Sequence, residues 1–294
     1  MRISVCITTF NESKNDLKKL LDALNNQTLK PDEIIVIDAK DYNNCSIAQG
    51  RNISIKKAKN EIIAITDVGC IPNKNWLEKI TKPFAEDKDV LVAGFYLMLY
   101  RNAMQKAASI FLGVSPNKFD KDKFLPSARS VAFSKSIWKK VGGFNEDLEK
   151  GGEDSEFFYK CVKAGVKIIR TKEARVVWEE IGRLTFSDVV KKFYVYAKGD
   201  GEAGIWYHPT KQLSSHNIKI SFIYIRYIIA FLLLIIGFNF PLAHFALLIS
   251  VIFYLLYSFK KARLWGVILQ LVSDITVMIG FVSGIMGKWI SKKV

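Results

Sequence analysis

The fold is decided by residues 3–12, ISVCITTFNE, where a run of β-branched and apolar residues ends in polar side chains. The run predicts a buried strand. Two further runs, EIIVID at residues 33–38 and IIAIT at residues 62–66, have the same character. Residues 16–29 and 46–59, which lie between these runs, predict helices. The order strand, helix, strand, helix, strand predicts right-handed crossovers and a parallel α/β sheet.

Polar side chains follow each of the three predicted strands. Thr9, Asn11 and Glu12 follow the first strand, Asp38 ends the second, and Asp67 follows the third. Ligands of such sheets bind outside the carboxyl ends of the strands. Three carboxylates at one edge form a like-charge cluster that needs a cation or ligand donors such as ribose hydroxyls or a base N–H. The alternative is that each acid caps the helix or turn that follows it.

The apolar residues are unevenly distributed along the chain. From residue 218 to residue 287 the sequence is a series of apolar runs, whereas the part before them alternates polar and apolar segments. This predicts a soluble domain over residues 1–215 and a membrane domain over residues 216–294. At ~1.5 Å per residue, each run is long enough to cross ~30 Å of hydrocarbon. The predicted membrane helices are about 220–238, 240–258 and 264–287.

Basic residues predict the orientation of the membrane domain. Lys260, Lys261 and Arg263 lie between the second and third runs, and the turn between the first two runs has no basic residue. The positive-inside rule therefore predicts a multi-pass protein of the cell membrane with a cytoplasmic soluble domain. The third run has Asp274 at its middle, and residues 288–293 carry three lysines that would fall outside if this run spans. The third run therefore either spans or is a re-entrant or interfacial segment.

Composition excludes several classes of protein. Of 294 residues, half are hydrophobic and 24% are charged, which excludes a disordered chain. The formal charge of +15 is explained by attraction to anionic head groups and phosphate-bearing substrates, and we expect no nucleic-acid partner. Four cysteines lie at scattered positions without metal-type spacing, which predicts reduced, buried thiols and no zinc site. They are Cys6, Cys45, Cys70 and Cys161.

Several short strings, taken in order, resemble one known family. They are ITTFNE at 7–12, EIIVID at 33–38, RN at 51–52, EIIAITD at 61–67, SARS at 127–130, VGGFNE at 141–146 and GED at 152–154. Over about residues 1–205, their order and spacing closely resemble the nucleotide-binding half of family 2 glycosyltransferases. That family has the GT-A fold, a Rossmann-like, mostly parallel central sheet with flanking helices. The resemblance implies transfer of a sugar from a nucleotide-sugar donor to an acceptor hydroxyl, with inversion at the anomeric carbon.

The resemblance also implies roles for individual residues. Asp38 would contact the base of the donor nucleotide, and Asp67 would approach the ribose or a metal-bound diphosphate. Asp154 would be the general base that takes the proton from the acceptor hydroxyl. The implied donor-site residues are Thr9, Asn11, Glu12, Asp38, Arg51, Asn52 and Asp67.

The chemistry of the reaction supports the assignment of the base. A direct displacement needs a base that faces the nucleophile and positive charge on the departing diphosphate. Glu153 and Asp154, at the start of a predicted helix, supply candidates for the base, and Arg183 and Lys198 are candidates for the diphosphate. The alternative is a helix N-terminus whose acidic residues only complement the helix dipole.

One departure from the family pattern concerns the metal. The family often carries Asp-x-Asp to hold a divalent ion, but here Asp67 is followed by Val68 and Gly69. One carboxylate, phosphates and waters can still hold Mg²⁺ or Mn²⁺, so Asp67 is the candidate metal ligand. The Gln-x-x-Arg-Trp motif of processive polysaccharide synthases is also absent, which predicts addition of a single sugar.

Two segments before the membrane runs have alternative interpretations. Residues 199–204, GDGEAG, match a dinucleotide-binding pattern, but Pro209 follows where that fingerprint requires a long helix. We expect instead a flexible loop over the active site or a plain linker. Residues 186–197 form an apolar helical stripe beside Lys191 and Lys192. The stripe fits a helix on the membrane surface or one packed against the catalytic core.

Together these features predict a membrane-anchored inverting glycosyltransferase. An anchor raises the effective concentration of an acceptor in the same membrane. This favours a lipid-linked saccharide or polyprenyl phosphate acceptor in glycan or surface polysaccharide assembly, and a soluble or protein acceptor is the alternative. Gly69 motivates a rival hypothesis, a non-catalytic membrane-anchored module that binds a nucleotide sugar. Arg226 and Asp274, within apolar runs, motivate a transporter as a second rival.

Overall fold

The computed structural model describes residues 1–148, 151–206 and 216–291. They form two compact units. The first, here called the sheet unit, comprises Met1–Leu99 and Val114–Arg183; the second, the helical unit, comprises Tyr100–Gly113, Leu184–Trp206 and the described residues from 216 onward. The predicted boundary at residue 215 stays a prediction. Two segments predicted to belong to the catalytic domain group with the C-terminal helices.

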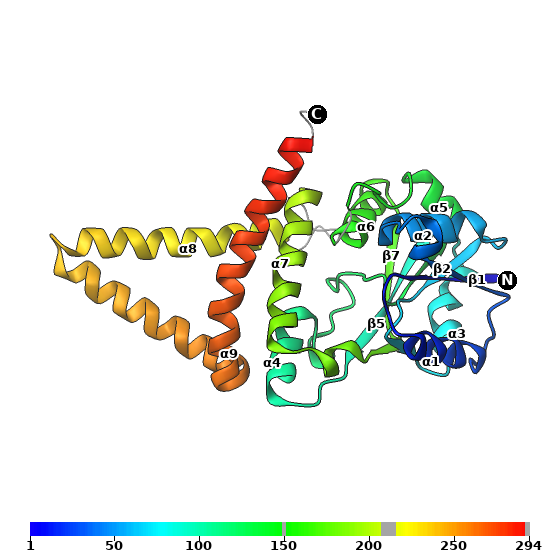
Figure 1. Ribbon diagram of the computed structural model, residues 1–294, viewed down its shortest axis with the longest axis horizontal. Helices are drawn as coiled ribbons and strands as arrows, with labels where there is room; N and C mark the ends of the chain where they lie inside the picture. Colours follow the sequence, from blue (N-terminus) through cyan, green and yellow to red (C-terminus); the bar gives the residue numbers. More distant parts are fainter. Residues whose placement is uncertain (149–150, 207–215, 292–294) are drawn as a thin grey trace. The chain divides into compact units, whose positions relative to one another are not determined.

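Seven strands of the described residues form one sheet, in the order β2-β1-β3-β6-β5-β7-β4 (Figure 1). The strands are β1 (Ile3–Thr9), β2 (Glu33–Asp38), β3 (Ile62–Ile65), β4 (Cys70–Pro72), β5 (Val90–Met98), β6 (Val131–Ser134) and β7 (Lys167–Trp178). The first three strands are parallel, as predicted, and β5 is parallel to β7. β6 is antiparallel to both of its neighbours, and β4 is antiparallel to β7. The predicted α/β sheet with flanking helices is confirmed, and its second half is mixed.

Helices cover both faces of the sheet (Figure 1). They are α1 (Lys14–Asn25), α2 (Ile47–Lys57), α3 (Trp76–Thr81), α5 (Lys135–Lys140) and α6 (Glu153–Lys163), with 3-10 turns η1 (Ala39–Tyr42), η2 (Lys82–Ala85), η3 (Pro116–Lys118) and η4 (Glu180–Arg183). α1 and α3 lie on one face, and α2, α5 and α6 lie on the other. On the second face, Cys6 and Ile63 of the sheet pack with Phe133, Phe157 and Phe158. β1 and β3 are buried on both faces, which explains their continuous apolar runs, whereas most residues of the edge strand β2 are half-buried.

The cysteines are consistent with this interior. All four are free and buried. Burial raises the pKa of Cys6 to about 12. A thiol with so high a pKa carries almost no thiolate at neutral pH, so Cys6 acts as a small apolar core residue.

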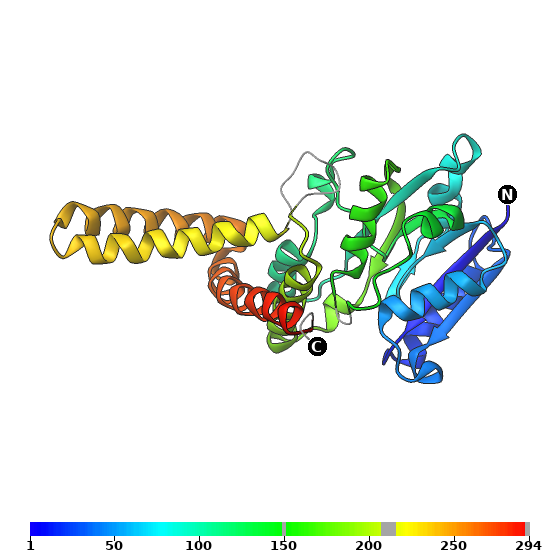
Figure 2. The same ribbon diagram turned by 90° about the horizontal axis from the view of Figure 1, so that it is seen from above.

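The helical unit consists of α4 (Ala103–Leu112), α7 (Phe186–Ala203), α8 (His216–Gly237) and α9 (Pro241–Ser291). α9 is broken by a kink at Ala262 and Arg263, whose backbone angles are not helical. The part before the kink, residues 241–261, is called α9a, and the part after it, residues 264–291, is called α9b. α8 and α9a are joined by a short turn and form a hairpin whose two helices diverge from that turn (Figure 1); Figure 2 shows the same pair from above. α8 and α9 are long and apolar enough to cross a membrane, and the three predicted runs correspond to α8, α9a and α9b.

The prediction of a loop or linker at residues 199–204 was wrong. Residues 199–203 form the end of α7, and Gly204 ends the helix in the left-handed conformation. The glycines serve packing: a Cβ at Gly201 would lie 2.6 Å from the carbonyl oxygen of Phe281 in α9b. The glycine pattern therefore permits close approach of two helices instead of forming a loop.

Candidate active site

The carboxyl ends of β1 and β3 meet the helix α2. Ser46 caps this helix, and its capping box with Gln49 is complete. The helix lies close against β1, because a Cβ at Gly50 would lie 2.4 Å from Cγ2 of Thr8. This close approach requires glycine at position 50. It brings the next residue of α2, Arg51, to the edge of the sheet.

Arg51 joins two of the predicted site carboxylates. Its Nη2 lies 2.9 Å from Oδ1 of Asp67, just after β3, and its Nη1 lies 2.5 Å from Oε1 of Glu153, the first residue of α6. The Arg51 and Glu153 side chains are 5% and 9% exposed, whereas the Asp67 side chain is 33% exposed. The guanidinium also lies 5.6 Å from the ring centroid of Phe144. Arg51 therefore links the donor edge predicted at β3 with the predicted catalytic pair.

The charges of this network shift the ionisation of its members. Burial by itself lowers the pKa of Arg51, but the carboxylates of Asp67 and of the Glu153-Asp154 pair outweigh burial and raise it above its ordinary value. Burial raises the pKa of Glu153; Arg51 opposes this rise and Asp154 adds to it, so the pKa stays above its ordinary value. Glu153 is thus closed in and turned to Arg51, and it is poorly placed to act on a substrate.

Asp154 is the more accessible member of the pair. It is half-buried in the first turn of α6. Gly152 enters that turn with φ +83, a conformation that favours glycine. The backbone N–H of Ala128 donates to Oδ2 of Asp154 at 3.4 Å, and Oδ1 accepts the N–H of Ser155. The carboxylate is therefore held by two backbone donors and has no side-chain cation of its own among the described hydrogen bonds.

The residues after β1 and at the end of β2 make local contacts. Oε2 of Glu12 accepts hydrogen bonds from Oγ1 of Thr9, at 3.0 Å, and from the N–H groups of Phe10 and Asn11. Asp38 caps η1 by accepting the N–H of Lys40 at 3.0 Å. Capping of the following turn, the alternative weighed from the sequence, is thus present for Asp38, whereas Glu12 accepts from the residues before it and Ser13 caps the helix that follows. It leaves open the predicted contacts of Thr9, Asn11, Glu12 and Asp38 with the donor nucleotide.

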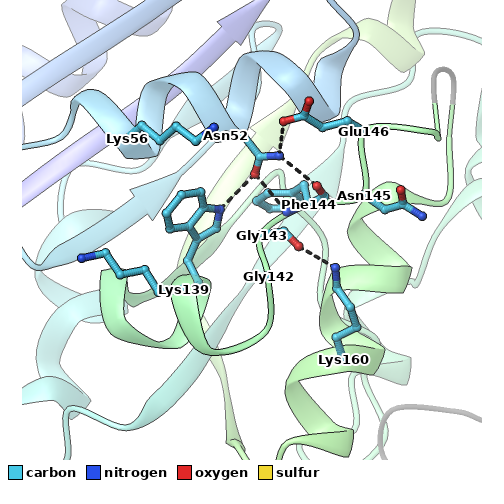
Figure 3. Close-up of a pocket in the computed structure, with 10 residues that line it drawn as sticks. Asn52, Lys56, Lys139, Gly142, Gly143, Phe144, Asn145, Glu146 and Lys160 are labelled. Atoms are coloured by element: carbon cyan, nitrogen blue, oxygen red, sulfur yellow. Dashed lines mark hydrogen bonds between the residues drawn. The ribbon is translucent and has the colours of Figure 1, made fainter.

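Asn52, predicted as a donor-site residue, holds a loop in place (Figure 3). Its Oδ1 accepts hydrogen bonds from Nε1 of Trp138 and from the N–H of Phe144, and its Nδ2 donates to the carbonyl of Phe144 and to Glu146. The amide has two donor hydrogens and two lone pairs, so all its capacity is used. A pocket of about 510 Å³ lies beside it, lined also by Lys56, Lys139 and Lys160. This pocket lies between α2, α5 and α6, and none of the predicted carboxylates of the strand edge lines it.

Arg183, predicted to contact the diphosphate, lies beside the turn after Asp67. A Cβ at Gly69 would lie 4.0 Å from Nη2 of Arg183. Nη1 of Arg183 lies 2.6 Å from Oδ2 of Asp16 on α1, and this hydrogen bond raises the pKa of Arg183. Lys198 belongs to the helical unit, where its Nζ lies 3.3 Å from Glu202. Its predicted role stays a prediction.

Comparison with known families identifies the chain. The family model for "glycosyl transferase family group 2" matches residues 73–282, more than half of the chain, and the model for "glycosyl transferase family 2" matches residues 4–45. The chain is a family 2 glycosyltransferase. The resemblance inferred from the short strings is therefore confirmed, and with it the enzyme class. A search of curated proteins finds no match to the chain.

One solved glycosyltransferase structure shares the fold, and another is similar at a lower TM-score. The mannosyltransferase PcManGT from Pyrobaculum calidifontis, in complex with GDP-Man and Mn²⁺, has a TM-score of 0.54 at 18% identity over 99% of this chain and 88% of its own. Residues 1–349 of S. aureus TarS, in complex with UDP, have a TM-score of 0.45 at 18% identity over 70% of this chain and 67% of their own. This glycosyltransferase spans 39% of the longer TarS chain.

The described side chains of this glycosyltransferase do not form a metal site by themselves. Among the described residues, no group of three or more His, Cys, Asp and Glu side chains could hold an ion. Gly69 stands where the family often has a second acid, and its φ of +86 is one that glycine favours. Oδ1 of Asp67 is engaged by Arg51. Among the described residues Asp67 is thus the candidate carboxylate for Mg²⁺ or Mn²⁺, and diphosphate oxygens and waters can complete the ligands of such an ion.

One residue that sequence analysis left without a role stands out beside this edge. The guanidinium of Arg129 lies 3.9 Å from the ring centroid of Trp178 and 5.1 Å from that of Tyr96, and its Nη1 donates to Oγ of Ser127 at 3.1 Å. Its neighbour Ala128 donates to Asp154. The SARS string at residues 127–130 is one of the strings that resemble the family. Nothing in the string itself shows that Arg129 stacks on an aromatic residue 49 positions later.

Proposed function

We propose that this glycosyltransferase moves a sugar from a nucleotide-sugar donor to an acceptor hydroxyl with inversion, with Asp154 as the general base. The observation that carries the proposal is the Arg51 network. It brings Asp67, on the predicted donor side, and Glu153 to one guanidinium, at 2.9 and 2.5 Å. Asp154, next to Glu153 in the chain, is half-buried and so open to a substrate.

In the proposed step, Asp154 accepts the proton of the acceptor O–H, a saccharide hydroxyl or the O–H of a lipid phosphate, as that oxygen attacks the anomeric carbon of the donor sugar. The bond between that carbon and the diphosphate oxygen breaks, and the nucleoside diphosphate leaves with the electron pair. Attack and departure on opposite faces give inversion. Positive charge is needed on the departing diphosphate, and Arg183, beside the Asp67 turn, is the residue we assign to it.

GDP-mannose is the first donor to test, because PcManGT, which was solved with GDP-Man, aligns with 99% of this chain. UDP- and dTDP-sugars are the comparison donors. Asp38 is the proposed contact to the base, with Thr9, Asn11 and Glu12 beside it. If a divalent ion takes part, Asp67 is its proposed protein ligand.

A lipid-linked saccharide or a polyprenyl phosphate is the proposed acceptor, in glycan or surface polysaccharide assembly. The support is the hairpin of α8 and α9a, which is long and apolar enough to enter a bilayer. Lys260, Lys261 and Arg263 follow the hairpin and, by the positive-inside rule, favour a cytoplasmic catalytic side. Confinement in the membrane would raise the effective concentration of such an acceptor.

The test is release of free nucleotide by the detergent-solubilised full chain from a panel of UDP-, GDP- and dTDP-sugars. Each donor is assayed with and without Mn²⁺ and with and without a polyprenyl phosphate. We expect selective release from one nucleotide class, stimulated by the lipid phosphate and lost in Asp154→Asn. The matched control is Asp147→Asn, which removes an exposed acid outside the Arg51 network.

The rival is a non-catalytic membrane-anchored module that binds a nucleotide sugar. Such a module would bind a donor but release no nucleotide under any acceptor condition. Asp154→Asn would then change neither its donor affinity nor the absence of nucleotide release. Release that persists in Asp154→Asn would instead show an enzyme with a different base.

A further inference from the structure

α9b packs closely against α7, and glycines of α9b lie next to backbone groups of α7. A Cβ at Gly280 would lie 2.5 Å from the carbonyl oxygen of Tyr194, and a Cβ at Gly284 would lie 2.1 Å from that of Lys198. At the start of both helices, the rings of Phe186 and Trp265 lie 6.3 Å apart. At their ends, Nζ of Lys288 donates to the carbonyl of Ala203 at 3.4 Å. The two helices therefore run parallel, side by side, over the whole of α7.

α7 is too charged to lie in hydrocarbon. Its 18 residues include six charged ones: Asp188, Lys191, Lys192, Lys198, Asp200 and Glu202. Charged side chains within the bilayer are costly and rare. Since α9b is held against α7 through glycines, α9b cannot cross the bilayer without drawing α7 into it.

The exposed side of α9b carries a single apolar stripe. Its residues follow one another at intervals of three or four, the spacing of one helix face. They are Leu271, Ile275, Ile279, Val282, Met286 and Trp289, each 41 to 66% exposed. The opposite side, with Gly280, Phe281 and Gly284, is buried. A helix with one apolar face and a polar partner helix behind it fits the plane of a membrane interface.

A polar cluster ties α9b to the root of the hairpin. Asp274 of α9b is fully buried, and its Oδ2 accepts hydrogen bonds from Arg226 and Tyr227 of α8 and from Tyr254 of α9a. Beyond this root, residues 227–259, the part of the hairpin between Arg226 and Lys260, contain no Asp, Glu, Lys or Arg.

The turn of the hairpin is suited to an apolar environment. The N–H groups of Phe238, Asn239 and Phe240 donate to carbonyls of the last turn of α8, and Pro241 has no N–H. Phe238, Phe240 and Leu242 are 67 to 78% exposed. Backbone donors satisfied within the turn are what hydrocarbon demands.

We infer that α9b lies flat in the membrane interface with its apolar stripe on lipid, and that, of the described residues, only those of the α8–α9a hairpin insert. The inference rests on the membrane association proposed above and names the lipid-facing surface. Lys288, at the end of α9b, then lies on the same side of the membrane as α7. This removes the conflict that the C-terminal lysines pose for a spanning third run.

The test uses spin labels on the full-length protein in lipid vesicles, with depth measured from the relative access of oxygen and a water-soluble nickel chelate. Labels are placed on the stripe through Leu271→Cys, Ile279→Cys and Met286→Cys, and in the hairpin through Leu232→Cys and Leu248→Cys. The four native cysteines are buried, so the unsubstituted protein measures background labelling. We expect the three stripe labels at one shallow depth, within ~5 Å of each other, because an in-plane helix keeps one face at one level. The hairpin labels should lie deeper.

A spanning α9b would give a different profile. Depth would then change by ~1.5 Å per residue, or ~22 Å from position 271 to position 286, and that result overturns the inference while leaving the membrane association intact. Hairpin labels open to the nickel chelate would overturn the membrane association itself. As a second measurement, Lys191→Cys and Lys288→Cys are expected to react with an impermeant maleimide from the same side of sealed vesicles. Reaction from opposite sides contradicts an in-plane helix.

Discussion

Each unit contains a cluster in which an arginine contacts one or more carboxylates, and the two clusters differ in the number of acids that surround the arginine. In the sheet unit, Arg51 is held by Asp67 and Glu153, with Asp154 close enough to raise the pKa of Arg51. One cation thus faces three acids. In the helical unit, Asp274 is the one described acid that contacts Arg226, and its other described partners, Tyr227, Tyr254 and Gln270, are neutral.

The acid of the second cluster is fully buried, whereas the first cluster has an acid that is partly exposed. Oδ2 of Asp274 accepts from Arg226, Tyr227 and Tyr254, and Oδ1 accepts from Nε2 of Gln270 at 2.8 Å. A carboxylate with four donors has no further capacity, so this cluster joins three helical segments. In the sheet unit, the acids exceed the cation and Asp154 stays half-exposed. Unbalanced acid at a strand edge is what a donor and an acceptor hydroxyl can use.

The largest expected effect is on turnover when the exposed acid of the first cluster is removed. Asp154→Asn keeps the shape of the side chain but removes the base, so kcat should fall ~10²–10⁴-fold. KM for the donor should stay within about threefold, because donor contacts are assigned elsewhere. Steady-state nucleotide release measures both constants. A rise in donor KM with unchanged kcat would move Asp154 from the base to the donor site.

Removing the cation of the first cluster should be the largest change in stability. Arg51→Met leaves buried Glu153 beside Asp67 without a partner, which we expect to lower the free energy of unfolding by ~3–5 kcal/mol. Arg51→Lys, which keeps one charge but not the two-pronged contact, should lose less. Thermal unfolding of the two variants checks this order. Equal stability of Arg51→Met and the natural protein would show that the acids are neutral in the fold.

The second cluster should behave as a coupled pair. Asp274→Ala strands the Arg226 guanidinium, and Arg226→Met strands the Asp274 carboxylate; each should destabilise the helical unit by ~2–4 kcal/mol. The double variant should cost less than the sum of the two, with a coupling of ~1–3 kcal/mol. Unfolding in detergent, followed by tryptophan fluorescence, provides the cycle. Additive losses would show that the two side chains act independently.

Sequence patterns predicted the first three strands, the helices between them and the residues at their carboxyl ends, because β-branched runs and helical periodicity are local signals. The membrane runs were found for the same reason. The apolar pattern stops at Lys260, Lys261 and Arg263, and this interruption indicated the break between the helices α9a and α9b.

Contacts between distant residues could not be predicted in the same way. The Arg51–Glu153 contact joins positions 102 residues apart, and the amide of Asn52 is filled by residues 86 to 94 positions away. The type and spacing of a residue show which hydrogen bonds its side chain can form. They do not show which of these hydrogen bonds are formed with distant residues of the fold. The glycines of α7 were misjudged because a close helix partner more than 75 residues later was needed to explain them.

The smallest expected effect is on the ion pair at the margin of the first cluster. Burial by itself raises the pKa of Asp16, but hydrogen bonds from Arg183 and Ser13 hold it below its ordinary value of 3.8. The stability that this pair contributes is therefore present above about pH 3.8 and lost as the pH falls through the lower folded pKa. The Arg183 side chain is 43% exposed, so Asp16→Asn should cost at most ~1 kcal/mol at pH 7.

As the pH falls through the folded pKa of Asp16, the difference in stability between this variant and the natural protein should disappear. The matched control is Asp22→Asn on the same helix, whose partner Lys18 is 73% exposed and which should change stability by less than ~0.5 kcal/mol at pH 7. Unfolding in urea measures both variants at pH 7 and at successively lower pH values through the acid range. A loss for Asp16→Asn that does not diminish as the pH falls would mean that Asp16 supports the start of α1 by packing or capping instead of by its charge, and Arg183 would then be held at the Asp67 turn by some other contact.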